Sequence, residues 1–546
     1  MENGQKQQDP ADGWLQVTVK DACGQNILGT VKVLPGRKLL DVCRGNRIGL
    51  EAACNGNGTC GKCRVRIQKG DAPATKDDRN IFSSQELADG YRLACRVEIF
   101  SDLAVCVGGG LETTRMQTLG LSGSGFSDAA ADREKERVCM IAADLGSTTL
   151  AAVLLAEDGT VLGQESAVNT QRSYGADVIS RIQASNEGKR EALRDCICRD
   201  LAGLFQSLVT QFAKTYRQTV RVSKIAVAAN TTMMHLLRGY SCETLGAVPF
   251  TPVNLGLECL PYREVFAECA DGPACPACGD SMVYLLCGMS AFAGADVTAG
   301  LYSSGFWQTP EQECAFFVDL GTNGELACGN RAGFVTASAA AGPAFEGGRL
   351  SCGIPGIPGA ISDVSFFCHR VRIRTIGQKK PCGICGTGAL SAAAALRQEH
   401  RMDAEGLLEP QLFANGFVLA SGEDGRKICL TQADIREIQM AKAAIRAGIE
   451  ILQEGVQVDR VYLAGGFGNY LQPETAFAIG LFPPEWKGKV ILCGNTSLKG
   501  AVAFLTDDAC GGALEEICGK NETVRLEECP SFADLYLRKM RFPSLP

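Results

Sequence analysis

Four cysteines constrain this chain more than any other feature. Three of them, Cys54, Cys60 and Cys63, lie in the run CNGNGTCGKC, and Cys95 follows after 31 intervening residues. Three thiolates in a glycine-rich loop and one distant thiolate are the ligand set of a two-iron two-sulfur cluster. The glycines of this loop tolerate left-handed backbone angles, so the loop can fold tightly with its amides toward the sulfurs. The spacing therefore predicts a protein that carries single electrons.

A structural zinc site is the alternative interpretation, but zinc ligands usually come as two short pairs. The Cys-x5-Cys-x2-Cys spacing resembles adrenodoxin-type ferredoxins rather than the plant type, whose first gap holds four residues. Alternating apolar and polar residues predict paired strands at 14–20 and 28–34, and a last strand at 91–99 that carries Cys95. This order resembles the β-grasp ferredoxin fold across residues 14–107. We expect Cys43 to be a buried thiol rather than a fifth ligand.

Composition excludes several classes of protein. A chain of 546 residues is too long for one core and predicts three or four structural units. The formal charge of −7 argues against a nucleic-acid partner, which would select a basic face. The start of the chain is polar, without a signal-peptide core, and no apolar run reaches the ~18 residues of a membrane span. The 27 cysteines form no even framework, so we expect free thiols in a reducing cytoplasm.

Residues 108–136 differ in composition from what precedes and follows them. They are rich in glycine, serine and charge and show no sustained periodicity. Such a segment is typical of a flexible linker, with a short ordered connector as the alternative. We therefore expect a ferredoxin domain at 1–107 that is tethered to the rest of the chain.

The remainder contains an internal repeat. The run VCMIAADLGSTT at 138–149 and the run AFFVDLGTNGE at 315–325 each combine a buried strand, an aspartate and a glycine turn, and each is followed by hairpin signals. The two aspartates, Asp144 and Asp319, lie 175 positions apart. Duplicated units of this kind resemble the sugar kinase, heat-shock chaperone and actin superfamily, in which two ribonuclease-H-like lobes close on ATP. The resemblance implies an α/β actin-like ATPase domain at 137–546, with lobes at about 137–312 and 313–546.

The chemistry of ATP accounts for the residue types in this repeat. Asp144 and Asp319 would face each other and hold hydrated Mg²⁺ on the nucleotide phosphates. Small residues at the two turns would offer amides and hydroxyls to phosphate oxygens. These turn residues are Gly146, Ser147, Thr148, Gly321, Thr322 and Asn323. A strand-end turn without function is the alternative for either copy alone.

A third motif, VDRVYLAGGFGNY at 458–470, resembles the adenosine motif of the same superfamily. Gly465 and Gly466, with Phe467, would let the backbone lie flat against adenine and ribose. Gly386 and Thr387 occupy an expected helix N-terminus, which suits an anion. An amphipathic helix upstream of the third motif has a polar face with Arg436, Glu437 and Lys442. We expect this face to be solvated, with a contact to ribose as the alternative.

A ferredoxin fused to such an ATPase resembles the reductive activators of corrinoid proteins. The motifs QRSYGADVISRI (171–182), AANTTMMHLL (228–237), AAGPAFEGG (340–348), GICGTG (383–388) and GNTSLKGA (494–501) are similar to those of that family. The resemblance implies ATP-dependent transfer of one electron from the cluster to cobalt(II) of a corrinoid protein, which yields cobalt(I) for methyl transfer. It also implies a low-potential electron donor. Whether the chain forms a homodimer stays open, because the family's further domain before the ATPase is not evident here.

Two other functions are compatible with these motifs. One is an ATP-driven electron donor to another low-potential enzyme such as a dehydratase, although dehydratase activators carry a four-iron cluster at a dimer interface. The other is a small-molecule kinase with a regulatory ferredoxin, for which no carboxylate base near a sugar-specific motif is evident. Hydrolysis of ATP stimulated by a corrinoid protein would separate the three.

Overall fold

The computed structural model describes residues 14–21, 24–46, 48, 50, 52, 54–107, 136–266, 275–422, 425–465 and 471–544. The expected linker at 108–136, apart from its last residue, and Gly466 and Phe467 of the third motif lie outside these ranges. Within them the chain forms two compact units. One comprises Met1–Thr113 together with Val168–Ile197, and the other comprises Thr114–Ala167 and Cys198–Pro546. None of the described helices is long and apolar enough to span a membrane.

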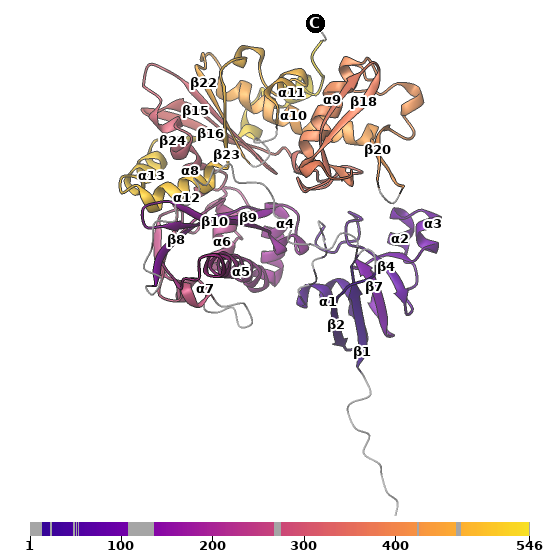
Figure 1. Cartoon of the computed structure of the whole chain (residues 1–546). Coiled ribbons are helices and arrows are strands. Elements are labelled where there is room, and N and C mark those ends of the chain that lie inside the picture. The colour runs from indigo at the N-terminus through magenta and orange to yellow at the C-terminus, as the bar shows by residue number, and fades with distance from the viewer. Residues whose placement is uncertain are drawn as a thin grey trace, which may run out of the picture. The chain divides into compact units, whose positions relative to one another are not determined.

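The first unit contains the predicted β-grasp fold (Figure 1). Its main sheet has the order β2-β1-β7-β4-β5, in which β1 pairs antiparallel with β2 and parallel with β7. Alternate valines of β1 lie fully buried in the domain core, as the period of two predicted. The elements are β1 (Leu15–Lys20), β2 (Ile27–Val33), β3 (Arg37–Lys38), α1 (Leu39–Gly45), β4 (Arg64–Lys69), α2 (Lys76–Ile81), α3 (Ser84–Ala88), β5 (Tyr91–Leu93), β6 (Glu98–Ile99) and β7 (Leu103–Val107).

The prediction of one strand at 91–99 is wrong. Cys95 lies in a turn between β5 and β6, where Arg96 and Val97 both donate backbone hydrogen bonds to the carbonyl of Leu93. The turn is also attached to the cysteine loop, since the Ala94 amide donates to the Cys63 carbonyl at 2.8 Å. A strand would place alternate side chains on opposite faces, whereas the turn directs Cys95 toward Cys63.

A segment from the second half of the chain belongs to the first unit. This docking segment, Val168–Ile197, contains η2 (Thr170–Ser173), α4 (Val178–Ala184), η3 (Ser185–Lys189) and the start of α5 (Arg190–Tyr216). Asp177 caps α4 by accepting from the Ser180 amide, which fixes where the helix begins. No sequence pattern indicated this grouping.

The second unit contains two sheets whose strand orders correspond. The first has the order β10-β9-β8-β11-β13-β12 and the second β23-β22-β14-β15-β16-β24. In the first sheet, β8 pairs antiparallel with β9 and parallel with β11. In the second, β14 pairs in the same way with β15 and β22. This repeated arrangement confirms the duplicated, actin-like fold class.

The strands and helices of the second unit have the following bounds, in chain order: β8 (Arg137–Leu145), β9 (Thr149–Ala156), β10 (Val161–Val168), β11 (Val220–Ala229), α6 (Thr231–Arg238), β12 (Glu258–Pro261), α7 (Tyr262–Phe266), β13 (Met282–Leu285), α8 (Ala295–Ser303), β14 (Ala315–Leu320), β15 (Gly324–Asn330), β16 (Gly333–Ala339), β17 (Ala360–Phe367), β18 (Arg370–Thr375), β19 (Gly383–Ile384), α9 (Gly386–Gln398), β20 (Phe417–Ser421), β21 (Lys427–Leu430), α10 (Gln432–Leu452), β22 (Arg460–Ala464), α11 (Pro473–Ala478), β23 (Val490–Gly494), α12 (Thr496–Thr506), α13 (Cys510–Gly519), β24 (Asn521–Thr523) and α14 (Phe532–Lys539).

Helices α8 and α12 join the two sheets of this unit. Both pack on β11, and α12 also packs on β8 although it follows β23 of the other sheet (Figure 1). One hydrophobic core includes Ala142 of β8, Leu498 of α12 and Phe317 of β14. Strands β8 and β14 therefore share one hydrophobic core.

Neither expectation for Lys442 was right. Its side chain is 1% exposed, and its ammonium group donates to the backbone carbonyls of Lys539 and Arg541, the latter at 2.7 Å. Burial lowers the pKa of Lys442 to about 7. Helix α14 packs on α10, so Lys442 is covered by the end of the chain, whereas Arg436 on the same helix is exposed, as expected of a solvated face.

Candidate functional site

The four cysteines of the ferredoxin-like domain come together as two pairs. The Sγ atoms of Cys63 and Cys95 are 3.4 Å apart, and Cys54 and Cys60 form a second hydrogen-bonded pair. The two pairs interact electrostatically, Cys60 with Cys63 and Cys54 with Cys95. Each iron of a two-iron cluster takes two protein ligands, whereas structural zinc takes all four around one centre. The paired arrangement therefore fits a two-iron cluster.

The thiols within each pair differ in their readiness to ionise. The hydrogen bond from Cys60 lowers the pKa of Cys54 to about 3, and the pKa of Cys60 is raised. In the same way the hydrogen bond to Cys63 lowers the pKa of Cys95 and raises that of Cys63. The thiolate is the form in which cysteine binds a metal. Cys43 is different, because it is fully buried in α1 and burial raises its pKa to about 12.

Backbone geometry and one arginine hold the loop in shape. Gly56, Gly58 and Gly61 all have positive φ, as predicted. A side chain at Gly58 would also meet the Arg96 guanidinium at 2.5 Å. Arg96 donates to the Asn57 carbonyl and to Asp77, both at 2.6 Å. Its positive charge also favours the thiolate form of Cys95.

The second site lies in the actin-like unit, where Asp144 and Asp319 occupy equivalent places. Each is the penultimate residue of a central strand, β8 or β14, and each is half-buried. Burial raises the pKa of both carboxyls, that of Asp319 to about 8. The two carboxylates also repel each other, so the structure brings the predicted pair together.

Two acidic residues that the sequence did not single out belong to this group. Burial raises the pKa of Asp296, at the start of α8, to about 7, and raises that of Glu325 on β15 well above its usual range. Both interact with Asp319. Repulsion among these carboxyls would be relieved by a divalent cation. Within the described ranges no three such side chains are placed to hold one metal ion directly.

The glycine turns lie beside these carboxylates. Gly146 follows β8, and a side chain there would meet the Thr149 carbonyl at 2.5 Å. Gly321 closes the equivalent turn after β14 by donating to the Asn323 carbonyl at 2.9 Å. The buried Thr322 hydroxyl has no hydrogen-bond partner among the described residues, as expected of a group that awaits a ligand.

Glu346, which the sequence pattern missed, links the two turns. Its Oε2 accepts a hydrogen bond of 2.7 Å from the Thr148 hydroxyl, and its Oε1 lies 3.8 Å from the position of a Cβ on Gly321. Glu346 is part of the run AAGPAFEGG (340–348), one of the motifs that resemble those of the family. Its carboxylate could have been noticed there as the only charged group of the run.

The third motif contacts the second carboxylate directly. Gly465 has a φ of 95°, and a side chain there would meet Asp319 Oδ1 at 2.6 Å and the Leu320 carbonyl at 2.5 Å. Its amide donates to Gly494, at the end of β23. Glycine is therefore required at this position by both conformation and space.

The helix N-terminus at Gly386 and Thr387 has a packing explanation. A side chain at Gly386 would collide with the Phe345 carbonyl at 1.7 Å, so glycine allows α9 to approach η6 (Pro343–Glu346). The Thr387 hydroxyl lies 3.2 Å from Cys385 Sγ. Gly386 therefore lets α9 pack against the turn that carries Glu346. The anion contact predicted for Gly386 and Thr387 stays a prediction.

Comparisons with known proteins match both halves of the chain. Family models match residues 25–99 (2Fe-2S iron-sulfur cluster binding domain), 139–309 (RACo middle region) and 313–545 (C-terminal domain of RACo, the ASKHA domain). The chain is 30% identical to the corrinoid activation enzyme RamQ of Eubacterium limosum over 451 residues, 77% of this chain and 73% of that protein.

Two further similarities point the same way. A Methanosarcina barkeri protein described as [Co(II) methylated amine-specific corrinoid protein] reductase is 33% identical over 235 residues, 38% of this chain and 41% of that protein. The solved structure of a reductive activator for corrinoid, iron-sulfur protein matches with a TM-score of 0.67 at 26% identity, over 97% of this chain and 98% of that one.

Proposed function

The chain belongs to the family of reductive activators of corrinoid proteins, and from this premise we propose how its two sites divide the reaction. The function is ATP-dependent reductive activation of a corrinoid protein, in which one electron reduces cobalt(II) to cobalt(I). The observation that carries it is the presence, in one chain, of two thiol pairs and a duplicated aspartate–glycine turn.

Cys54, Cys60, Cys63 and Cys95 are the proposed cluster ligands. When bound, a two-iron cluster supplies one electron at a time. The protein's part is to keep the ligands deprotonated and the loop closed, which Arg96 supports through its charge and its contact with Asn57. A low-potential donor is needed to reduce this site before each turnover.

Asp144 and Asp319 are proposed to position hydrated Mg²⁺ on the phosphates of ATP. Support comes from their matched places on β8 and β14 and from the carboxyl repulsion that a cation would relieve. The two turns would donate amides and hydroxyls to phosphate oxygens, with Thr322 as the hydroxyl in need of a partner. Gly465 leaves room beside Asp319, and adenosine would lie along Gly465, Gly466 and Phe467.

ATP is required because the electron step alone is uphill. Even a plant-type ferredoxin cluster, whose cysteine spacing differs from the one here, has a potential of only about −400 mV, and reduction of cobalt(II) to cobalt(I) is expected below that. Each ~59 mV of mismatch costs a factor of ten in the equilibrium of a one-electron transfer. Nucleotide binding can offset this cost if the corrinoid partner has two states, one of which is easier to reduce. The nucleotide-bound protein must then bind that state more tightly than the other.

The hydrolysis reaction tests this proposal. A cobalt(II) corrinoid protein should stimulate ATP hydrolysis by the wild type, and Asp319→Asn should remove hydrolysis while the visible spectrum of the cluster stays the same. Transfer of phosphate to an added hydroxyl compound would instead indicate a kinase. If a dehydratase stimulates ATP hydrolysis and a corrinoid protein does not, the protein is instead an electron donor to another low-potential enzyme.

A further inference from the structure

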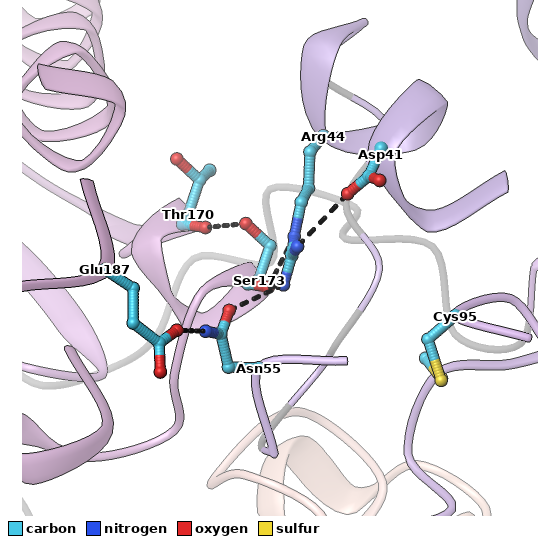
Figure 2. A network of polar contacts seen from close by, with 8 residues as sticks. Asp41, Arg44, Asn55, Cys95, Thr170, Ser173 and Glu187 are labelled. Carbon is cyan, nitrogen blue, oxygen red and sulfur yellow. Dashed lines mark hydrogen bonds and ion pairs between the residues drawn. The ribbon is translucent and has the colours of Figure 1, made fainter. Parts of the chain in front are cut away.

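The docking segment Val168–Ile197 contacts the cluster domain through Arg44, at the end of α1 (Figure 2). The Arg44 side chain is 10% exposed, which is unusual for a charged group on a short surface helix. Its Nε donates to the Ser173 carbonyl at 2.8 Å, and its Nη2 donates to the same oxygen. The guanidinium also lies over the Tyr174 ring, 4.8 Å from the centroid.

Asn55 extends this contact to the cysteine loop. It directly follows Cys54, and its Oδ1 accepts from Arg44 Nη2 at 3.2 Å. Its Nδ2 donates to Glu187 Oε2, also at 3.2 Å, so one amide bridges Arg44 and the far end of the docking segment (Figure 2). The φ of 50° at Asn55 is in the left-handed region, which asparagine tolerates better than most residues.

The contact is of a kind that can open. Among the described residues, the core of the cluster domain runs from Val17 to Val107 and includes none of the docking segment. Arg44 and Asn55 instead contact the segment through hydrogen bonds and a cation–π contact. Gly188, directly after Glu187, has a φ of 87° inside an otherwise helical run, and a side chain there would meet nothing within 4 Å. The backbone at this glycine can change direction without a steric cost.

The loop that the docking segment holds is also the loop through which electrons can leave. Cys63 and Cys95 are each 1% exposed, whereas Cys54 and Cys60 are both partly exposed. A redox partner therefore comes nearest to the ligands on the Cys54–Cys60 side, where Asn55 is engaged.

We propose that Arg44 and Asn55 form a latch that holds the cysteine loop on the docking segment, and that the latch opens before the loop meets its electron acceptor. The identity of the physiological acceptor rests on the proposed function. The latch itself does not, because it predicts access to the loop for any acceptor.

Hydrogen–deuterium exchange on the full-length protein with its cluster tests whether Arg44 holds the segment. In Arg44→Ala we expect the amides of 168–187 to exchange at least about tenfold faster, because the loss of even one charged hydrogen bond has an effect of that size. Strands β1 and β4 should be unchanged. Arg79→Ala, which removes an exposed arginine of the same domain, should behave as the wild type. Equal exchange in Arg44→Ala and Arg79→Ala would overturn the proposal.

Electron transfer to cytochrome c, an acceptor that needs no ATP, tests whether the latch limits access. The chemically reduced Arg44→Ala and Glu187→Ala proteins should reduce cytochrome c several-fold faster than the wild type and Arg79→Ala. An unchanged or lower rate would mean that the docked loop is already open to acceptors, which contradicts the latch. If the variants are faster but the wild type activates no corrinoid protein, the proposed function fails and the latch stands.

Discussion

Asn495 donates a hydrogen bond of 2.8 Å from Nδ2 to Oδ2 of Asp144, across 351 positions of sequence. Ser497 donates from Oγ to the other carboxylate oxygen at 2.7 Å. Asn495 is also the N-cap of α12, where its Oδ1 accepts from the Leu498 amide. The positive end of α12 therefore adjoins the first carboxylate of the nucleotide site. Asn495 and Ser497, which belong to the motif GNTSLKGA, therefore hold Asp144 of the first aspartate–glycine turn in place.

Removing one of these donors should weaken the metal site without unfolding the protein. Both hydrogen bonds lower the pKa of Asp144 against the effect of burial, so in Ser497→Ala its carboxylate is harder to ionise. We expect the Mg²⁺ concentration for half-maximal ATP hydrolysis to rise about tenfold. Thr506→Ala, at the exposed end of the same helix, is the control. Identical Mg²⁺ dependence in the two variants would place the metal elsewhere.

Gly465 and Gly455 offer a matched pair of substitutions. Both have positive φ, but a side chain at Gly455 meets nothing within 4 Å, whereas one at Gly465 meets Asp319 and Leu320. Gly455→Ala should cost about 1 kcal/mol in the free energy of unfolding and leave hydrolysis intact. Gly465→Ala should in addition displace Asp319 and lower kcat for hydrolysis more than ~10-fold. An equal kcat for ATP hydrolysis in the two variants would show that hydrolysis does not depend on the present position of Asp319.

The carboxyl cluster predicts how pH affects the metal site. The pKa values of Asp296 and Asp319, about 7 and about 8, lie above the ordinary value of 3.8. Between about pH 4 and pH 8 the unfolded chain has lost protons that the folded protein keeps, so these groups lower the free energy of unfolding as pH rises. Mg²⁺ needs the ionised form, so its affinity should rise from pH 6 to pH 8.5. The increase in Tm on adding Mg-ATP should be larger at pH 8.5, and an equal increase at both would contradict this.

The cysteine pairs predict the metal content. The protein should contain two iron and two sulfide per chain, since four thiolates in two pairs hold two irons. Cys54→Ser, Cys60→Ser, Cys63→Ser or Cys95→Ser should lose or destabilise the cluster, while Cys43→Ser should keep it because that thiol is buried in the core. Iron and sulfide analysis with visible absorption measures this. Zinc without iron or sulfide would contradict the assignment.

Local patterns predicted much of this molecule, because several key features are local. The strand, aspartate and glycine around Asp144 and Asp319 are contiguous in sequence, and so is the loop from Cys54 to Cys63. The contacts of Asn495 with Asp144 and of Glu346 with Thr148 join positions about 200 to 350 residues apart and arise only from packing. The burial of Lys442 follows from the fold of a tail almost 100 residues later. No period or motif encodes such contacts.

The docking segment could not be predicted for the same reason. Its motif QRSYGADVISRI indicated the family, but its contact with Arg44 depends on a backbone carbonyl, that of Ser173. Any residue can present a carbonyl, so the sequence carries no mark of this contact. The position of Cys95 was missed because the attachment of Ala94 to Cys63 outweighs the local strand preference of 91–99.

The central claim is that ATP drives one electron from the cysteine site to the cobalt of a partner. It is tested most directly by the absorption of cobalt(I) in a mixture of this protein, a cobalt(II) corrinoid protein and a low-potential reductant. With Mg-ATP, cobalt(I) should appear with the wild type and fail to appear with Cys63→Ser, which still hydrolyses ATP, or with Asp319→Asn, which can still be reduced. Formation of cobalt(I) at the same rate without ATP would contradict the account.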